Sequence, residues 1–147
     1  MEGIVSILGW IATIDAFQHW VYTNPEHTRE ERYEKWIELG DRFGSILDWS
    51  GFEDWRKVGW QKQLHLFSYP FYYIEYGIAQ LGALQLWLQY KENPDSALEN
   101  YANAMRLGGS RPLPNLFQAG GMQLDFGRET VQGLIEAVRE ELSTLPA

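Results

Sequence analysis

The composition of this 147-residue chain excludes several classes of function. Its formal net charge of -8 argues against a nucleic-acid partner and against an anionic membrane surface, because both require a basic patch. The absence of cysteine excludes thiolate metal sites, disulfides and cysteine nucleophiles, and it fits a cytoplasmic protein. Apolar residues make up 45% of the chain, which predicts a single folded domain, residues 1–147, with its own core.

The first predicted helix covers residues 3–23, where apolar side chains recur in every turn until Pro25 disfavours helix in the residue before it. Its apolar start is too short to span a bilayer. Asp15 and His19 are four residues apart, and we interpret them as a pair that satisfies each other or a neighbouring helix; the alternative is that they line a substrate cleft. They belong to a polar seam at three- and four-residue spacing: Asp15, Gln18, His19 and Tyr22.

A second helix should begin at a capping box, Thr28 with Glu31 three residues later, and end near residues 43–44. A loop over residues 45–51 then leads to a shorter helix over about 52–63. Gly59 interrupts this third helix or kinks it.

Residues 70–91 predict a central helix. Pro70 suits the first turn, where its missing N–H is no loss, and the side chains that follow are apolar almost all round, which is typical of a buried helix. His65 would lie just before it. Spacing alone favours tyrosines that satisfy one another inside a core. These tyrosines, with an amide, recur at helical spacing: Tyr69, Tyr72 or Tyr73, Tyr76 and Gln80.

The last third of the chain predicts three more helices. Asn93 as cap and Pro94 at the first position begin one that stops at the glycine pair 108–109. A short helix precedes the glycine pair 120–121, and the last element spans about 129–142. No segment alternates with a period of two. We therefore predict an all-α chain, a single irregular helical bundle of six or seven helices around the buried central helix.

Four segments of the chain together carry a resemblance to a known protein family. The longest is His-Leu-Phe-Ser-Tyr-Pro-Phe-Tyr-Tyr-Ile-Glu-Tyr-Gly-Ile-Ala-Gln-Leu-Gly-Ala, residues 65–83. The others are Trp-Ile-Ala-Thr-Ile-Asp-Ala-Phe-Gln-His-Trp at 10–20, Asp-Trp-Ser-Gly at 48–51 and Gly-Gly-Ser-Arg-Pro-Leu-Pro at 108–114. In the same order, these segments resemble the C-terminal part of the oligoendopeptidase F family, zinc metallopeptidases related to thimet oligopeptidase. The resemblance covers nearly the whole chain.

The resemblance implies that this chain supplies part of a zinc peptidase but none of its zinc ligands. Zinc peptidases of this kind bind the metal through His-Glu-x-x-His and a later Glu. The three histidines of this chain, at positions 19, 27 and 65, are never four residues apart, so we expect no cofactor to bind this chain alone, whereas the complete family enzyme holds zinc.

The site residues that the resemblance implies are His65, Tyr73 and Tyr76 as catalytic residues. They would donate hydrogen bonds to the peptide carbonyl oxygen as negative charge develops, each worth roughly 3–4 kcal/mol of barrier. Tyr69 and Tyr72 are the candidate substrate-binding residues. Which of the four tyrosines face the substrate stays open.

We therefore predict a C-terminal fragment or subunit of a zinc metalloendopeptidase that hydrolyses short peptides and is inactive alone. Its partners would be a short peptide substrate and the half that carries zinc. The alternative hypothesis is a non-catalytic helical peptide-binding or scaffold protein derived from the same fold. Under both, the surface that faces the absent half is exposed and apolar, so we expect a homo-oligomer formed through it.

Overall fold

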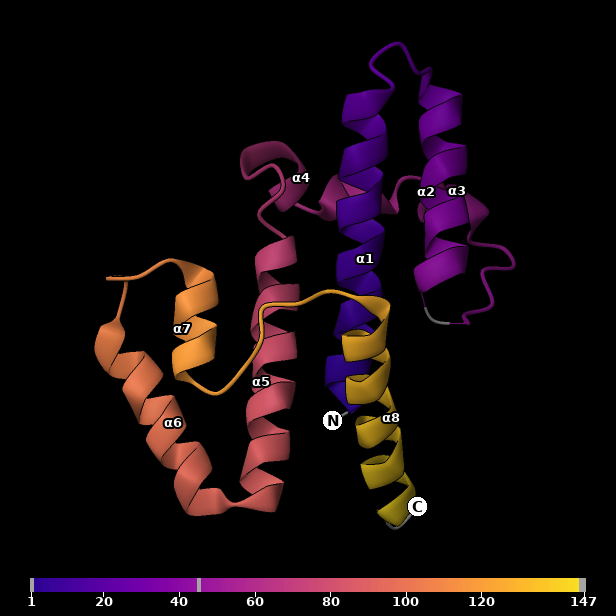
Figure 1. The fold of residues 1–147 in the computed structure, drawn as a ribbon. Helices are drawn as coiled ribbons and strands as arrows, with labels where there is room; N and C mark the ends of the chain where they lie inside the picture. The colour runs from indigo at the N-terminus through magenta and orange to yellow at the C-terminus, as the bar shows by residue number, and fades with distance from the viewer. Residues whose placement is uncertain (1, 45, 146–147) are drawn as a thin grey trace. The chain divides into compact units, whose positions relative to one another are not determined.

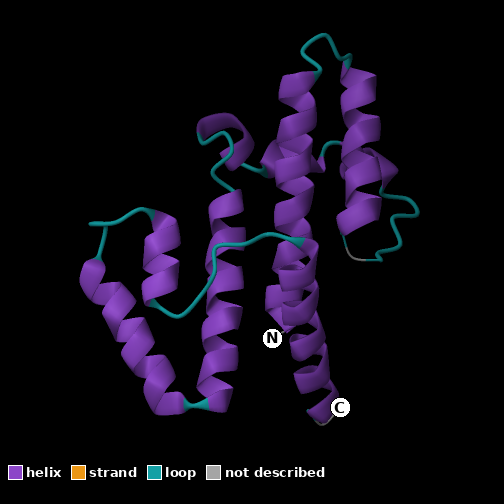
Figure 2. Cartoon of the chain, viewed as in Figure 1, coloured by secondary structure: helices purple, strands orange, loops and turns teal. Residues whose placement is uncertain are grey.

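The computed structural model describes residues 2–44 and 46–145, and this part of the chain is helical without strands (Figure 1, Figure 2). The prediction of an all-α fold is confirmed. The eight α-helices among the described residues exceed the predicted six or seven because one short helix, α4, was not predicted. In chain order the elements are α1 Glu2–Thr23, α2 Arg29–Phe43, α3 Glu53–Lys57, the 3₁₀ helix η1 Gly59–Lys62, α4 His65–Ser68, α5 Ile74–Glu92, α6 Pro94–Leu107, α7 Leu113–Ala119 and α8 Arg128–Thr144.

The chain divides into two compact units, Glu2–Gly77 and Ile78–Ala147, with the boundary inside α5. That the whole chain forms a single domain stays a prediction. Within the described residues, no helix combines the length and the apolar character needed to cross a membrane.

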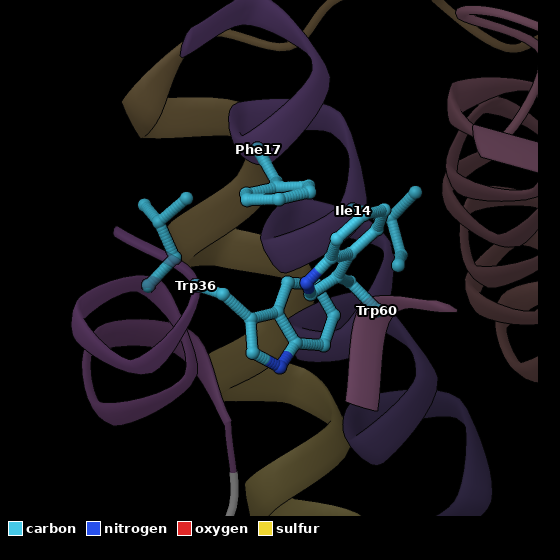
Figure 3. Packing of buried hydrophobic residues seen from close by; sticks show 5 residues of the cluster. Ile14, Phe17, Trp36 and Trp60 are labelled. Carbon is cyan, nitrogen blue, oxygen red and sulfur yellow. The ribbon is translucent and has the colours of Figure 1, made fainter. Parts of the chain in front are cut away.

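In the unit Glu2–Gly77, α1 and α2 lie side by side and bury a set of large side chains between them and η1 (Figure 1). Trp36 packs edge-on against Phe17, with ring centroids 5.1 Å apart (Figure 3). Its indole N–H donates to the carbonyl oxygen of Arg56 at 3.1 Å. We call this set the tryptophan core: Ile14, Phe17, Trp36, Leu39 and Trp60.

A local signal in the sequence explains how α2 begins, and a glycine of α1 allows the end of α2 to pack closely. The Thr28 hydroxyl accepts from the Glu31 N–H at 3.2 Å, and the Glu31 carboxylate accepts from the Thr28 N–H at 2.8 Å, so the predicted capping box is confirmed. The Thr28 hydroxyl also donates to the Glu31 carboxylate at 3.0 Å, and the bonds that this carboxylate accepts from the Thr28 N–H and hydroxyl lower the pKa of Glu31. At the other end, Gly9 of α1 allows close packing, because a Cβ there would collide with the backbone oxygen of Phe43.

The unit Ile78–Ala147 contains the rest of α5 with α6, α7 and α8. As predicted, Asn93 caps α6 by accepting from the Ser96 N–H at 3.1 Å, and Pro94 is the first helical residue. Gly82 of α5 lies against Phe117 of α7, where a Cβ would be only 3.1 Å from the ring. The buried apolar side chains of this unit are Leu81, Leu84, Ala97, Phe117, Leu134 and Val138.

The predicted start of the central helix is wrong. We expected a helix over 70–91 with Pro70 in its first turn, but α5 begins at Ile74. Phe71 has φ of 58°, in the left-handed region that an α-helix cannot contain, so the chain turns before the helix starts. In addition, α5 is not buried on all sides, because Glu75, Tyr76 and Tyr90 are exposed.

Candidate functional site

The five site residues expected from the sequence lie together in the unit Glu2–Gly77. His65 is the first residue of α4, and the tyrosines follow in the turn after α4 and in the first turn of α5. The imidazole is central, because its ring centroid lies within 6.2 Å of the ring centroid of each tyrosine. These distances are 4.9 Å to Tyr73, 5.8 Å to Tyr76, 6.0 Å to Tyr72 and 6.2 Å to Tyr69. We call these five residues the tyrosine cluster.

A chain reversal brings these rings together. Helix α4 ends at Ser68, and the left-handed Phe71 turns the backbone so that the Tyr72 N–H donates to the Tyr69 carbonyl oxygen at 3.1 Å. Tyr72 thereby returns to His65 and stacks on it, with an interplanar angle of 9°. The first turn of α5 then places Tyr76 edge-on against the same imidazole. The cluster therefore depends on the turn as much as on helical spacing.

Gln63 sets the orientation of the imidazole. Its side-chain nitrogen lies 2.8 Å from Nδ1 of His65, and because the amide N–H can only donate there, a neutral imidazole carries its proton on Nε2. That Nε2 lies 3.5 Å from the Tyr76 hydroxyl, which is long for a hydrogen bond. Two proton donors, Nε2–H and the Tyr76 O–H, thus lie side by side. Nothing in the sequence pointed to Gln63 beyond its position two residues before the histidine.

The cluster presents its phenols to solvent. Tyr69, Tyr72 and Tyr76 are 57%, 49% and 40% exposed, whereas His65 and Tyr73 are half-buried. An exposed group of apolar rings that carry hydroxyls is typical of a binding surface, since the rings contact apolar parts of a ligand and the hydroxyls bond to its polar groups. The arrangement can hold an extended peptide and donate hydrogen bonds to one of its carbonyl oxygens.

The cluster does not fit a metal site. It offers one imidazole and no carboxylate, whereas zinc in peptidases takes three protein ligands. Across residues 2–44 and 46–145, no group of three or more His, Cys, Asp or Glu side chains is arranged to hold a metal ion.

The polar seam on α1 reaches the same turn. His19 Nε2 and Asp15 Oδ2 are 3.5 Å apart, which agrees with the interpretation of these residues as a pair. Gln18 is 2% exposed, and its Oε1 accepts from the N–H of Phe71 at 3.3 Å. The rings of His19 and Tyr22 lie 5.0 and 5.2 Å from the ring of Phe71.

The same unit also contains a cleft that sequence reasoning missed. Its volume is about 1030 Å³, and tryptophans from α1, α2, α3 and the loop before α3 line it, together with Arg56 and Lys62. Trp55 at its edge is 74% exposed. We call it the apolar cleft; its tryptophans are Trp10, Trp36, Trp49 and Trp55. Its residues come from five separate segments, α1, α2, the loop before α3, α3 and η1, so no single sequence motif predicts it.

Solved structures that resemble this chain are peptidases. One, described as an oligoendopeptidase F, is 33% identical with a TM-score of 0.80, and the match covers 94% of this chain and 25% of that one. Another, PZ peptidase A with an inhibitor, is 31% identical with a TM-score of 0.85, and the match covers 95% of this chain and 25% of that one. No family model and no curated protein matches. The chain thus spans about a quarter of the length of the solved structures it matches.

Proposed function

We propose that this chain supplies the substrate-binding and transition-state-stabilising part of a zinc metalloendopeptidase of the oligoendopeptidase F type, which hydrolyses short peptides. The similarity to one quarter of two peptidases supports this proposal. The single observation that carries it is the tyrosine cluster, in which four phenols surround one imidazole whose tautomer is set by Gln63.

In this proposal, His65 and Tyr76 act on the carbonyl oxygen of the peptide bond that is cleaved. Their donor atoms are 3.5 Å apart, so both can point at one oxygen on which negative charge develops. Each such donor lowers the barrier by roughly 3–4 kcal/mol. Tyr73, whose ring centroid lies 5.1 Å from that of Tyr76, is the third catalytic residue. The exposed phenols of Tyr69 and Tyr72, which lie next to each other, bind the substrate.

The zinc ion belongs, in this proposal, to a polypeptide with His-Glu-x-x-His, a motif that this chain does not contain. We therefore propose that the chain acts only together with that polypeptide. The apolar cleft offers an exposed surface for a protein partner, and self-association of the isolated chain is expected through such surfaces. The partner supplies the metal chemistry, and this chain positions the peptide and its carbonyl group.

The proposal is tested by complementation. The chain is mixed with a zinc-binding polypeptide equivalent to the other three quarters of such a peptidase, and cleavage of a short fluorogenic peptide is measured. We expect no cleavage by the chain alone and cleavage by the mixture. Tyr76→Phe should lower the rate of the mixture by roughly 10²–10³-fold, the usual effect of losing one such donor.

Tyr101→Phe is the matched control, since it removes a hydroxyl from an exposed tyrosine of α6 outside the cluster. If the mixture containing Tyr76→Phe cleaves the peptide as fast as the wild-type mixture, the role given to this hydroxyl is wrong. A chain that binds the peptide in the presence of a chelator but never supports cleavage would instead be a non-catalytic binding protein.

A further inference from the structure

We propose that Gln18 of α1 is a positioning residue for the tyrosine cluster: its buried amide holds the backbone of Phe71 and so fixes the turn that brings the tyrosines to His65. The inference rests on the proposed function of the cluster and deepens it. Its evidence is a strained turn, a buried polar side chain attached to that turn, and an unfavourable burial that packing alone does not explain.

The turn needs support from outside itself. Phe71 is the one non-glycine residue with positive φ in the part of the chain that the structure describes, and its φ is 58°. A bulky side chain in this region brings Cβ too close to the following carbonyl oxygen, so the conformation persists only where surrounding contacts hold it. Because Tyr72 and Tyr73 follow at once, relaxation of Phe71 would move both rings away from His65.

The contacts that hold Phe71 come from α1. The Phe71 N–H donates to Oε1 of Gln18 at 3.3 Å, across 53 positions of the sequence. The Phe71 ring lies against His19 and Tyr22, which are one and four residues farther along the same helix. A hydrogen bond thus holds the backbone of the turn, and two rings hold its side chain.

A packing role alone does not account for Gln18. The side chain is 2% exposed, and its Nε2 is buried without a hydrogen-bond partner. A buried donor without a partner destabilises the fold, and an apolar side chain of similar size would avoid this cost. What an apolar residue cannot do is accept the Phe71 N–H. The amide of Gln18 therefore destabilises the core but stabilises the turn at Phe71, which indicates a positioning role.

The test compares Gln18→Met with the wild-type full chain by nuclear magnetic resonance and thermal unfolding. Met has similar length but no acceptor oxygen. We expect hydrogen exchange of the Phe71 amide to become at least tenfold faster and the ring-proton shifts of His65 to move toward those of a free histidine, because Tyr72 no longer stacks on it. The melting temperature should stay the same or rise, since the unpartnered donor is gone.

Two further variants keep the test decisive. Gln18→Glu retains an oxygen at this position and should preserve the protection of Phe71 and the shifts of His65. Gln118→Met, on an exposed face of α7, controls for loss of an amide and should change none of these signals. The proposal is overturned if Gln18→Met leaves Phe71 and His65 unchanged, or if it lowers the melting temperature and speeds exchange throughout the unit. Tyr76→Phe tests the peptidase role separately, so the failure of either proposal is recognisable.

Discussion

Two groups of aromatic rings lie in the unit Glu2–Gly77, and they differ in exposure more than in packing. In the tryptophan core the ring of Phe17 lies 5.1 Å from Trp36 and 5.8 Å from Trp60, and in the tyrosine cluster neighbouring rings are 4.9–6.2 Å apart. The three core rings are between 2% and 9% exposed. Three of the four tyrosines are between 40% and 57% exposed.

This contrast separates rings that stabilise the fold from rings available to a ligand. Burial of large aromatic side chains is a main source of folding free energy, and the buried Trp36 also satisfies its N–H with a backbone carbonyl. The exposed tyrosines contribute less burial and leave their hydroxyls in contact with solvent. Substitutions in the first group should therefore change stability, whereas substitutions in the second should change binding or catalysis.

The largest effect on stability is expected from Phe17→Ala. Phe17 is 2% exposed and contacts Trp36 and Trp60, so its removal leaves a cavity in the tryptophan core. We expect the free energy of unfolding to fall by about 3–5 kcal/mol, measured by chemical denaturation. Phe126→Ala, at a side chain that is 47% exposed, is the control and should cost far less. A similar loss of unfolding free energy for both variants would contradict the expectation that buried rings stabilise the fold more than exposed rings.

The two aromatic groups also differ in how well the sequence predicts them. The helices around the tryptophan core follow from local signals, such as the capping box of Thr28 and Glu31, because each signal and its partner lie within one helical turn. The resemblance to a peptidase family predicted which residues form the tyrosine cluster. It did not predict how the chain brings their rings together. Spacing placed the phenols on one stripe of a single helix, and the structure instead gathers them with a turn at Phe71.

That turn could not be predicted because its cause is distant. Nothing near Phe71 indicates a left-handed conformation, which glycine or asparagine would have signalled. The contacts that hold it come from Gln18, His19 and Tyr22, some 50 positions earlier. The sequence did show these α1 residues as a polar seam, but not what the seam binds. The apolar cleft was missed for the same reason, since its tryptophans come from separate segments.

A smaller loss of stability is expected from Thr28→Ala, which removes the cap of the helix that carries Trp36. The cost should be about 1 kcal/mol near neutral pH. The Glu31 carboxylate accepts from the Thr28 N–H and from the Thr28 hydroxyl, and both bonds lower the pKa of Glu31 in the folded chain. The variant loses the bond from the hydroxyl, whose contribution to stability is present above the pKa of the unfolded state and is lost as the pH falls through the lowered value. The difference between variant and wild type should therefore shrink on acidification, measured by denaturation at several pH values. A difference independent of pH would show that the bond from the Thr28 hydroxyl to the Glu31 carboxylate adds nothing to stability.

The smallest effect on stability is expected from Tyr76→Phe, although we predict that the same substitution lowers the rate of cleavage by roughly 10²–10³-fold. Tyr76 is 40% exposed, and the contact of its hydroxyl with His65 Nε2, at 3.5 Å, is too long to contribute much to the fold. We expect the free energy of unfolding to stay within about 0.5 kcal/mol of the wild-type value. Chemical denaturation of the isolated chain measures this without a partner. A loss as large as that of a core residue would mean that the hydroxyl supports the fold, and any loss of catalysis in the same variant would then have a structural cause.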